Sequence, residues 1–174
     1  MTNAVLESLK TRRSCRKYEA KQISDEELNA VLEAGTWAPT AMGMQEPIMV
    51  VLQDPEKIAK VERLNSAVMG NPDGHPFYGA PTVVIVFSDS SRPNIFVEDG
   101  SLVMGNLLNA AHAVGLGSCW IHRAREVFAT EEGKALKKEW GIPDSYEGIG
   151  NCILGYAVEE APAKPRKEGY VIRG

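Results

Sequence analysis

Residues 82–87 read TVVIVF, which is the strongest strand pattern in the chain. The run is apolar throughout and lacks the polar alternation of a strand that faces water, so both of its faces are expected to be buried. A strand of this kind lies inside a sheet and needs other elements packed against it. The feature therefore predicts a domain in which helices surround a mostly buried sheet.

Hydrophobic periodicity and turn residues predict the remaining elements. Ser24 and Glu27 have the spacing of a capping box, so we expect a helix that ends near Gly35. The long pattern 94–114 is apolar around much of its circumference, which predicts a helix buried in the core or at a subunit interface. Residues 65–80 have no clear period and are expected to form a mobile loop. Further helices are expected at 2–11, from 55 to about 64 and in stretches up to 140, further strands at 48–52, 119–122 and 152–156, and an extended Pro-rich tail.

Composition limits the class of protein. The 174 residues suit a single domain, 1–174, and contain no internal repeat. A net charge of −4 gives no general basic surface, so nucleic acid is not an expected partner. The chain has no apolar run of about 18 residues, so no membrane span is expected. Charged residues interrupt the first positions where a signal peptide is apolar, and we therefore expect a cytoplasmic chain.

Cysteines and histidines do not form a metal-binding pattern. The three histidines have no ligand spacing, and His112 falls within the buried helix pattern, where a hydrogen-bonded core histidine is expected. The cysteines lack a C-x-x-C spacing and are expected to be reduced, unpaired thiols. Cys119 lies beside apolar residues, which favours a buried structural thiol over a nucleophile. The other two cysteines are Cys15 and Cys152.

The sequence GLGS at 115–118 resembles part of a dinucleotide-binding loop. Such a loop follows a strand and opens a helix, whereas this one follows a helix and lacks the third glycine. We therefore expect these glycines to end the helix before them.

Residues 12–16 read RRSCR and concentrate positive charge near the start of the chain. Arg12, Ser14 and Arg16 share one side if the segment is extended, and the two arginines still meet at i, i+4 if it is helical. Converging guanidiniums beside a hydroxyl favour a phosphate ligand. A solvated basic turn is an equally open interpretation of the residues alone. A second basic cluster, KPRK at 164–167, could join the first because chain termini often lie close together.

These features occur in the order of the nitroreductase family of flavin enzymes. RRSCRKY at 12–18 resembles the RRSxRxF opening of that family, and SDEEL at 24–28 resembles the SxEEL that leads its next helix. The resemblance continues through the segments 38–47, 78–81, 106–120 and 153–156 and the Lys-Pro-Arg tail. It spans nearly the whole chain.

The resemblance implies an α+β fold in three α/β/α layers, with helices flanking a mainly antiparallel central sheet. It implies an intertwined homodimer with FMN at the subunit interface. It further implies that reducing equivalents pass from NAD(P)H to a nitroaromatic, quinone or similar conjugated small-molecule acceptor by a ping-pong mechanism. The flavin carries that chemistry, so no side chain receives a catalytic role and no metal is expected.

The resemblance also assigns FMN-binding residues. Arg12 and Ser14 match residues that hold the phosphate and ribityl chain, with Arg13 adjacent. Arg16 matches the basic residue beside the pyrimidine end of the ring, where a cation stabilises the negative charge of reduced flavin. The loop that reaches the ring from the partner subunit corresponds to Pro39, Thr40, Ala41 and Gln45. The segment under the reactive face corresponds to Trp120, Ile121, His122 and Arg123. The C-terminal phosphate clamp corresponds to Lys164 and Arg166.

Three residues in two segments depart from the family pattern. Gly43 stands where the family commonly has Asn, and His122 and Arg123 stand where Gly-Gly or Glu-Gly is frequent. Arg123 either brings an extra cation to the flavin ring or points to solvent and pairs with an acid such as Glu126. Two other functions also stay open: a dimer that stores FMN without turnover, and an enzyme of the same fold with another flavin reaction, such as dehalogenation.

Overall fold

The computed structural model describes residues 1–92, 95–159 and 161–174. Within these residues one antiparallel sheet has the strand order β1-β2-β4-β3. Its strands are β1 (Ile48–Leu52), β2 (Thr82–Asp89), β3 (Gly117–Ile121) and β4 (Tyr146–Gly155). The helices are α1 (Ala4–Thr11), α2 (Asp25–Thr36), α3 (Pro55–Val68), α4 (Phe96–Ala113), α5 (Ala124–Ala129) and α6 (Glu131–Glu139), with a 3-10 turn η1 (Ala41–Gly43).

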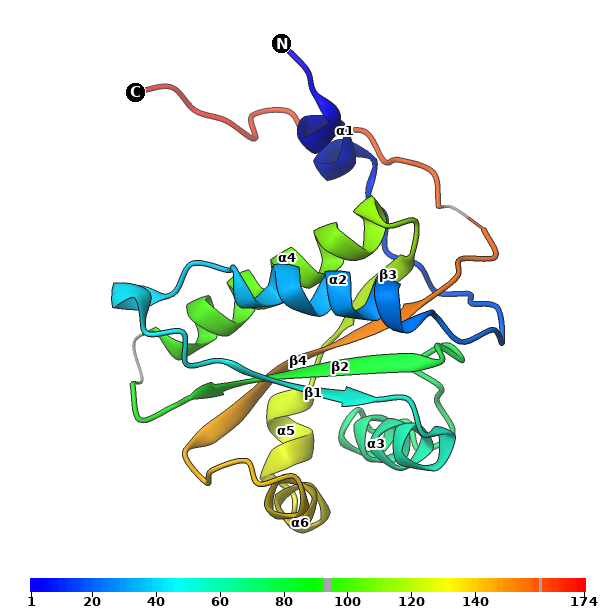
Figure 1. Ribbon diagram of the computed structural model, residues 1–174, viewed down its shortest axis with the longest axis vertical. Helices are drawn as coiled ribbons and strands as arrows, with labels where there is room; N and C mark the ends of the chain where they lie inside the picture. The colour runs from blue at the N-terminus through cyan, green and yellow to red at the C-terminus, as the bar shows by residue number, and fades with distance from the viewer. Residues whose placement is uncertain (93–94, 160) are drawn as a thin grey trace.

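The prediction that 82–87 forms a central strand is confirmed. β2 lies between β1 and β4, and its side chains alternate between two hydrophobic clusters. Val83, Ile85 and Phe87 pack toward α3, α5 and α6, whereas Val84 and Val86 pack toward α2 and α4. Figure 1 shows these two groups of helices on opposite sides of the sheet. The α+β fold in three layers is therefore also confirmed.

Helix α2 begins as the sequence predicts. The Ser24 hydroxyl accepts a hydrogen bond from the Glu27 amide at 3.2 Å, and the Glu27 carboxylate accepts one from the Ser24 amide at 2.8 Å. This reciprocal pair is the capping box, which satisfies two amides at the helix start.

The expected end of α3 near residue 64 is wrong, because the helix continues to Val68. Asn65 and Ser66 are polar yet fully buried. Asn65 donates to the His122 carbonyl at 2.9 Å, and the Ser66 hydroxyl donates to the Gly74 carbonyl at 2.6 Å. These residues have the local sequence pattern of a loop, and contacts with other segments stabilise them in a helix. The mobility of the remaining loop stays a prediction, although Phe77 anchors it in the core with 1% exposure.

Strand β4 begins earlier than the expected 152, at Tyr146. Its first half contains glycines, which weaken a strand pattern in sequence. A Cβ at Gly150 would lie 2.6 Å from Trp120 Nε1, and one at Gly148 would lie 2.7 Å from the Ala124 backbone. The glycines therefore allow β3 and α5 to approach the strand closely.

Helix α4 ends at Ala113, just before the glycines that were expected to end it. Gly115 has a φ of +84°, and the Leu116 amide donates to the Ala111 carbonyl at 2.8 Å. The expected start at Asn94 lies outside the described residues. His112 is half-buried and bonds Thr11 Oγ1 at 2.8 Å, so its prediction as a core residue is wrong, although the ring has a partner.

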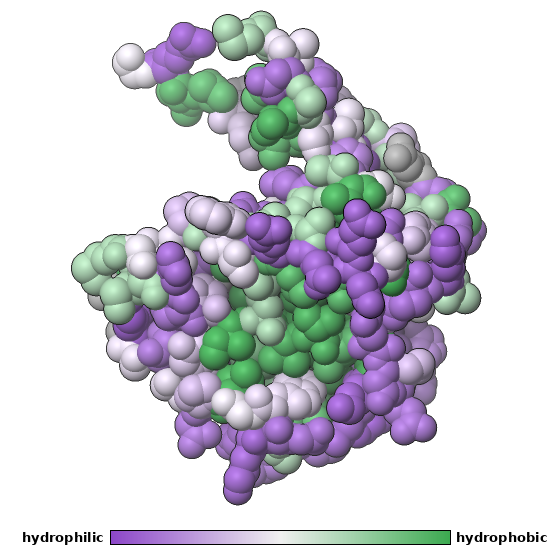
Figure 2. Space-filling model, in the orientation of Figure 1, coloured by the Kyte–Doolittle hydropathy of each residue, from purple (hydrophilic) through white to green (hydrophobic). Residues whose placement is uncertain are grey.

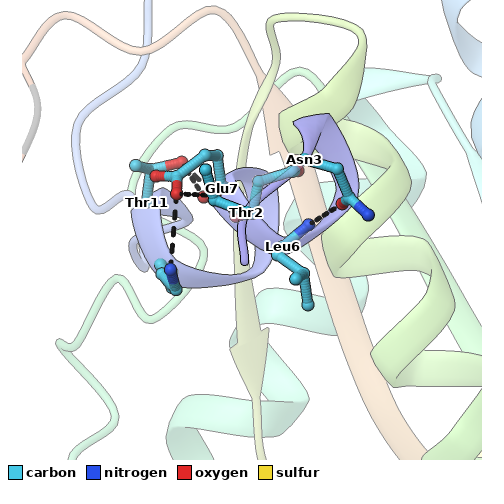
Figure 3. Close-up of polar contacts among 7 residues, drawn as sticks. Thr2, Asn3, Leu6, Glu7 and Thr11 are labelled. Atoms are coloured by element: carbon cyan, nitrogen blue, oxygen red, sulfur yellow. Dashed lines mark hydrogen bonds and ion pairs between the residues drawn. The ribbon is translucent and has the colours of Figure 1, made fainter.

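Helix α1 and the C-terminal tail stand away from the body of the molecule (Figure 1). Asn3 caps the start of α1 by accepting from the Leu6 amide at 2.9 Å, and the Thr11 hydroxyl donates to the Glu7 carbonyl near its end at 2.7 Å (Figure 3). None of the residues of α1 is buried. Figure 2 shows the space between this arm and the body, and an apolar area across the middle of the body where β1 and β2 run.

None of the helices in the described parts of the chain has the length and hydropathy needed to cross a membrane.

Candidate functional site

The basic segment 12–16 runs beside β3. Ser14 forms a parallel bridge with Ser118, and the Cys15 amide donates to the Ser118 carbonyl at 2.9 Å. Of the two conformations considered for this segment, the structure has the extended one. The segment is therefore attached to the edge of the sheet instead of forming a free turn.

Arg12 is the most informative side chain of this segment. Its Nη1 atom is buried and has no hydrogen-bond partner within the described residues. An unsatisfied buried donor costs about 1–3 kcal/mol, and more when it is charged, so an anionic ligand fits this position. Burial raises the pKa of the Cys119 thiol, and the charge of Arg16 is the main effect opposing it, with Arg12 acting in the same direction. Both cations are therefore close enough to the thiol at β3 to act on its pKa.

Arg13 has a different environment. Its Nη1 donates to the Lys10 and Arg12 carbonyls, each at 2.7 Å. These contacts satisfy carbonyl groups at the end of α1, so its guanidinium is engaged by the backbone.

A pocket of about 200 Å³ lies at the end of β3. It brings together Arg16 and the whole predicted segment 120–123. Its remaining lining comes from residues that were not predicted to belong to the site, namely Met69, Pro76, Tyr78 and Cys119. The loop after α3 therefore supplies one wall of the site.

Strained backbone is concentrated around these segments. Tyr78 and Arg123 have φ values of +52° and +78°, and both line the pocket. Met42 and Gln45, at +55° and +52°, lie in the predicted flavin-contacting loop, and these four are the non-glycine residues with positive φ in the described chain. Each such conformation costs on the order of 1–3 kcal/mol, and such costs are commonly found at functional sites.

The turn that carries His122 and Arg123 is fixed from two sides. Asn65 of α3 donates to the His122 carbonyl at 2.9 Å, and the Arg123 carbonyl accepts from the Val127 amide at 2.9 Å. The Arg123 side chain lies 3.8 Å from the Glu126 carboxylate, and both side chains remain more than 40% exposed. Arg123 thus has the weak surface partner that was considered and also lines the pocket.

The loop 39–45 lies near the start of α4, whereas the basic segment lies near the end of that helix. The Ala41 amide donates to Asp99 Oδ1 at 2.9 Å near the start of α4, whereas Thr11 contacts His112 near its end. Asp99 and His112 are separated by about 20 Å along the axis, at ~1.5 Å per residue. Within one chain, Pro39, Thr40, Ala41 and Gln45 are therefore not brought together with the basic segment.

The C-terminal clamp residues are also not joined to that segment. Lys164 and Arg166 are exposed, and Arg166 Nη2 donates to the Lys164 carbonyl at 2.6 Å. In the described residues no hydrogen bond or ion pair links them to Arg12 or Ser14. The start of the tail does approach, because Ala161 lines a pocket of about 120 Å³ together with Ser14.

Comparison with protein-family models places this chain. The model of the nitroreductase family matches residues 9–77 and 71–156. The chain belongs to the nitroreductase family. A protein of Methanothermobacter thermautotrophicus named for NADH dehydrogenase/NAD(P)H nitroreductase activity is 31% identical over 159 residues, which cover 89% of this chain and 78% of that protein.

Solved nitroreductase structures have the same fold. The FMN-bound nitroreductase of Bacteroides fragilis is 30% identical and matches with a TM-score of 0.90 over 99% of this chain and all of that one. The FMN-bound nitroreductase of Desulfitobacterium hafniense matches with a TM-score of 0.90 over the full length of both chains, at 24% identity.

The two departures from the nitroreductase pattern occupy similar backbone conformations. Gly43 has a φ of +64°, and a Cβ there would meet no atom within 4 Å. Asn tolerates this left-handed region better than most residues, so both amino acids suit the position. Arg123 occupies the same region with a long side chain, where the family often has glycine.

Two residues that position the site were missed. Asp99 is only 4% exposed and holds the loop that was predicted to contact the flavin, while its Oδ2 has no partner among the described residues. A carboxylate within an apolar helix pattern was the available signal. For Asn65, which holds the His122 turn, the sequence offers none, because its partner is distant in the chain.

Proposed function

We propose that this nitroreductase-family protein is an NAD(P)H-dependent oxidoreductase that uses FMN and reduces a nitroaromatic, quinone or similar conjugated acceptor by a ping-pong mechanism. The family match and the FMN-bound relatives support the cofactor. Relatives named NAD(P)H nitroreductase and FMN reductase [NAD(P)H] support the electron donor. The observation that carries the proposal is the buried Arg12 Nη1, a charged donor that has no acceptor among the described residues and that lies in the segment resembling the family's phosphate site.

The residues of the basic segment fit FMN. Arg12 and Ser14 would hold the phosphate and ribityl chain, because a guanidinium and a hydroxyl supply charge-assisted hydrogen bonds to an anion. Arg16 lies at the pocket, where its cation would stabilise negative charge at the pyrimidine end of the ring. When bound, FMN supplies two-electron redox chemistry.

The pocket at β3 would admit the donor and then the acceptor. Met69, Tyr78 and Trp120 form apolar walls that suit a planar, conjugated molecule and limit water. Cys119 also lines this pocket, but burial raises the pKa of its thiol. The thiol is therefore neutral near pH 7 and unsuited to nucleophilic attack. The side chains of the pocket would bind and orient the substrates, while the cofactor carries the electron transfer of the ping-pong mechanism.

We propose that the active form is an intertwined homodimer with FMN at the interface. The flavin-contacting loop lies about 20 Å along α4 from the basic segment of its own chain, so a second copy is the natural source of the missing half. An apolar groove of about 490 Å³ runs between α1, α2 and α4, and Leu102 of α4 is exposed. The arm adds the exposed apolar residues Tyr170, Val171 and Ile172. Such surfaces mark protein interfaces.

A cytoplasmic location is part of the proposal. Three free cysteines, all buried, suit a reducing compartment.

Steady-state kinetics test the proposed function. Oxidation of NADPH should depend on a quinone acceptor, and double-reciprocal plots at several quinone concentrations should give parallel lines, as ping-pong exchange requires. Intersecting lines would contradict the mechanism. Tight FMN binding without any NADPH oxidation would favour a storage protein.

Light scattering tests the assembly. The proposal predicts a particle of twice the 19.0 kDa chain mass. A monomer that binds FMN with full affinity would contradict a shared site.

A further inference from the structure

The pocket at the end of β3 has an unbalanced charge. Three of its lining residues, Arg16, His122 and Arg123, carry cationic or donor groups, and none of the lining residues in the described chain is Asp or Glu. The other walls include Met69, Tyr78 and Trp120, which are apolar or aromatic. A planar molecule with one negatively charged substituent matches this combination, because its ring packs on the walls while the cations bind the charge.

Arg123 is the residue whose presence most needs an explanation. Its backbone lies in the left-handed region with a φ of +78°, which glycine adopts without cost and a residue with a Cβ does not. The turn is held in that shape by Asn65 through the His122 carbonyl and by the first turn of α5. A long cationic side chain therefore stands at the pocket wall in a backbone conformation that would suit glycine better, and such strain is commonly found at functional sites.

The neighbouring carboxylate does not use this cation fully. The Arg123 and Glu126 side chains are 3.8 Å apart, which is longer than a hydrogen bond, and both are partly exposed to water. Exposed pairs of this kind contribute little to stability. A ligand carboxylate or phosphate could accept two parallel hydrogen bonds from the same guanidinium, which is the stronger arrangement.

We propose that Arg123, together with His122, binds an anionic group on the substrate that reacts at this pocket and makes this enzyme prefer substrates that carry that group. The group is a carboxylate on a conjugated acceptor or a phosphate on the nucleotide donor. This inference rests on the proposed oxidoreductase function and adds the charge of the substrate to it.

The test compares 4-nitrobenzoate with 4-nitrobenzamide, which have nearly the same shape but differ in charge. The FMN-loaded wild type should have a kcat/KM at least about tenfold higher for the benzoate, the scale of one charge-assisted hydrogen bond. Arg123→Gln should remove most of that preference through KM, whereas Arg123→Lys should keep part of it. Arg63→Gln is the matched control, because it removes an exposed arginine that pairs with Glu132 on α6, outside the pocket.

The donor is examined in the same variants. If Arg123→Gln instead removes a preference for NADPH over NADH, the bound group is the nucleotide phosphate. If Arg123→Gln changes kcat/KM equally for the two nitro compounds, and equally for NADPH and NADH, the proposed anion site is wrong. Arg123→Gly, which suits the left-handed backbone, repeats the comparison in case the glutamine variant folds poorly.

Calorimetry separates this inference from the proposed function. 4-Nitrobenzoate should bind the FMN-loaded wild type at least about tenfold more tightly than 4-nitrobenzamide, and Arg123→Gln should remove the difference. A protein that binds benzoate selectively but never oxidises NADPH would contradict the proposed function and leave the anion site standing. Equal binding of 4-nitrobenzoate and 4-nitrobenzamide, together with a preference between NADPH and NADH that Arg123→Gln leaves unchanged and with normal turnover, would contradict the anion site alone.

Discussion

The basic segment 12–16 and the pocket at the end of β3 are built in opposite ways. The basic segment consists of consecutive residues attached to one strand, and its key groups, Arg12 and Ser14, lie two positions apart. The pocket is assembled from Arg16, the loop after α3 and the turn after β3, and two of its residues have strained backbones. The segment is therefore a local motif that needs only an anion to complete it. The pocket depends on long-range contacts that hold unfavourable conformations.

The largest effect is expected at the basic segment. Arg12→Ala should weaken FMN binding by about 1.5–3 kcal/mol, because it removes charge-assisted hydrogen bonds to the phosphate. Riboflavin, which lacks the phosphate, should bind poorly to wild type and be little affected. Fluorescence titration of both flavins measures the two affinities.

Arg13→Ala is the matched control for that experiment. Arg13 donates to backbone carbonyls at the end of α1, so its loss should change FMN affinity much less. Equal losses in the two variants, or an equal loss of FMN and riboflavin binding in Arg12→Ala, would show that the contrast between the neighbouring arginines is wrong.

The second effect concerns the support of the pocket. Asn65→Ala removes a fully buried side chain and the donor to the His122 carbonyl, which should lower the free energy of unfolding by about 1–3 kcal/mol. The KM for the acceptor should rise, while FMN affinity should change less than in Arg12→Ala. Denaturant unfolding and steady-state kinetics measure these quantities.

Asn29→Ala provides the comparison for Asn65. Asn29 is an exposed residue of α2, and such surface substitutions usually change stability by less than about 0.5 kcal/mol. If Asn65→Ala is as mild as Asn29→Ala, the turn after β3 does not depend on α3.

The smallest effect is expected from Arg123→Gly. Glycine removes the strain of the left-handed conformation but is more flexible in the unfolded chain, so the net gain in stability should be about 1 kcal/mol or less. Losing the cation should also lower the flavin midpoint potential, by roughly 30 mV for each 1.4 kcal/mol of lost stabilisation of the anionic reduced form. Thermal unfolding and spectroelectrochemistry give the two values. An unchanged midpoint would place the Arg123 cation too far from the ring to act on it.

The same contrast explains what could be predicted from the sequence. The capping box at Ser24 and the central strand depend on neighbouring residues, and the structure contains both. The extended conformation of the basic segment was left open, because its pairing with β3 involves residues far along the chain. The extension of α3 through Asn65 and the glycine-containing half of β4 depend on partners far along the chain, so their local patterns were misleading. For the same reason Tyr78 was missed as a pocket residue, whereas Asp99 could have been found from its carboxylate within an apolar helix pattern. The separation of the loop 39–45 from the basic segment could be inferred only from the family resemblance, as a site shared between two chains.

The most direct test of the central claim is an anaerobic spectrum of the purified protein. The account predicts a yellow protein with FMN absorbance, which NADPH bleaches and a quinone restores in one cycle each. A colourless protein that does not take up added FMN, or a yellow protein that neither NADPH nor NADH bleaches, would contradict it.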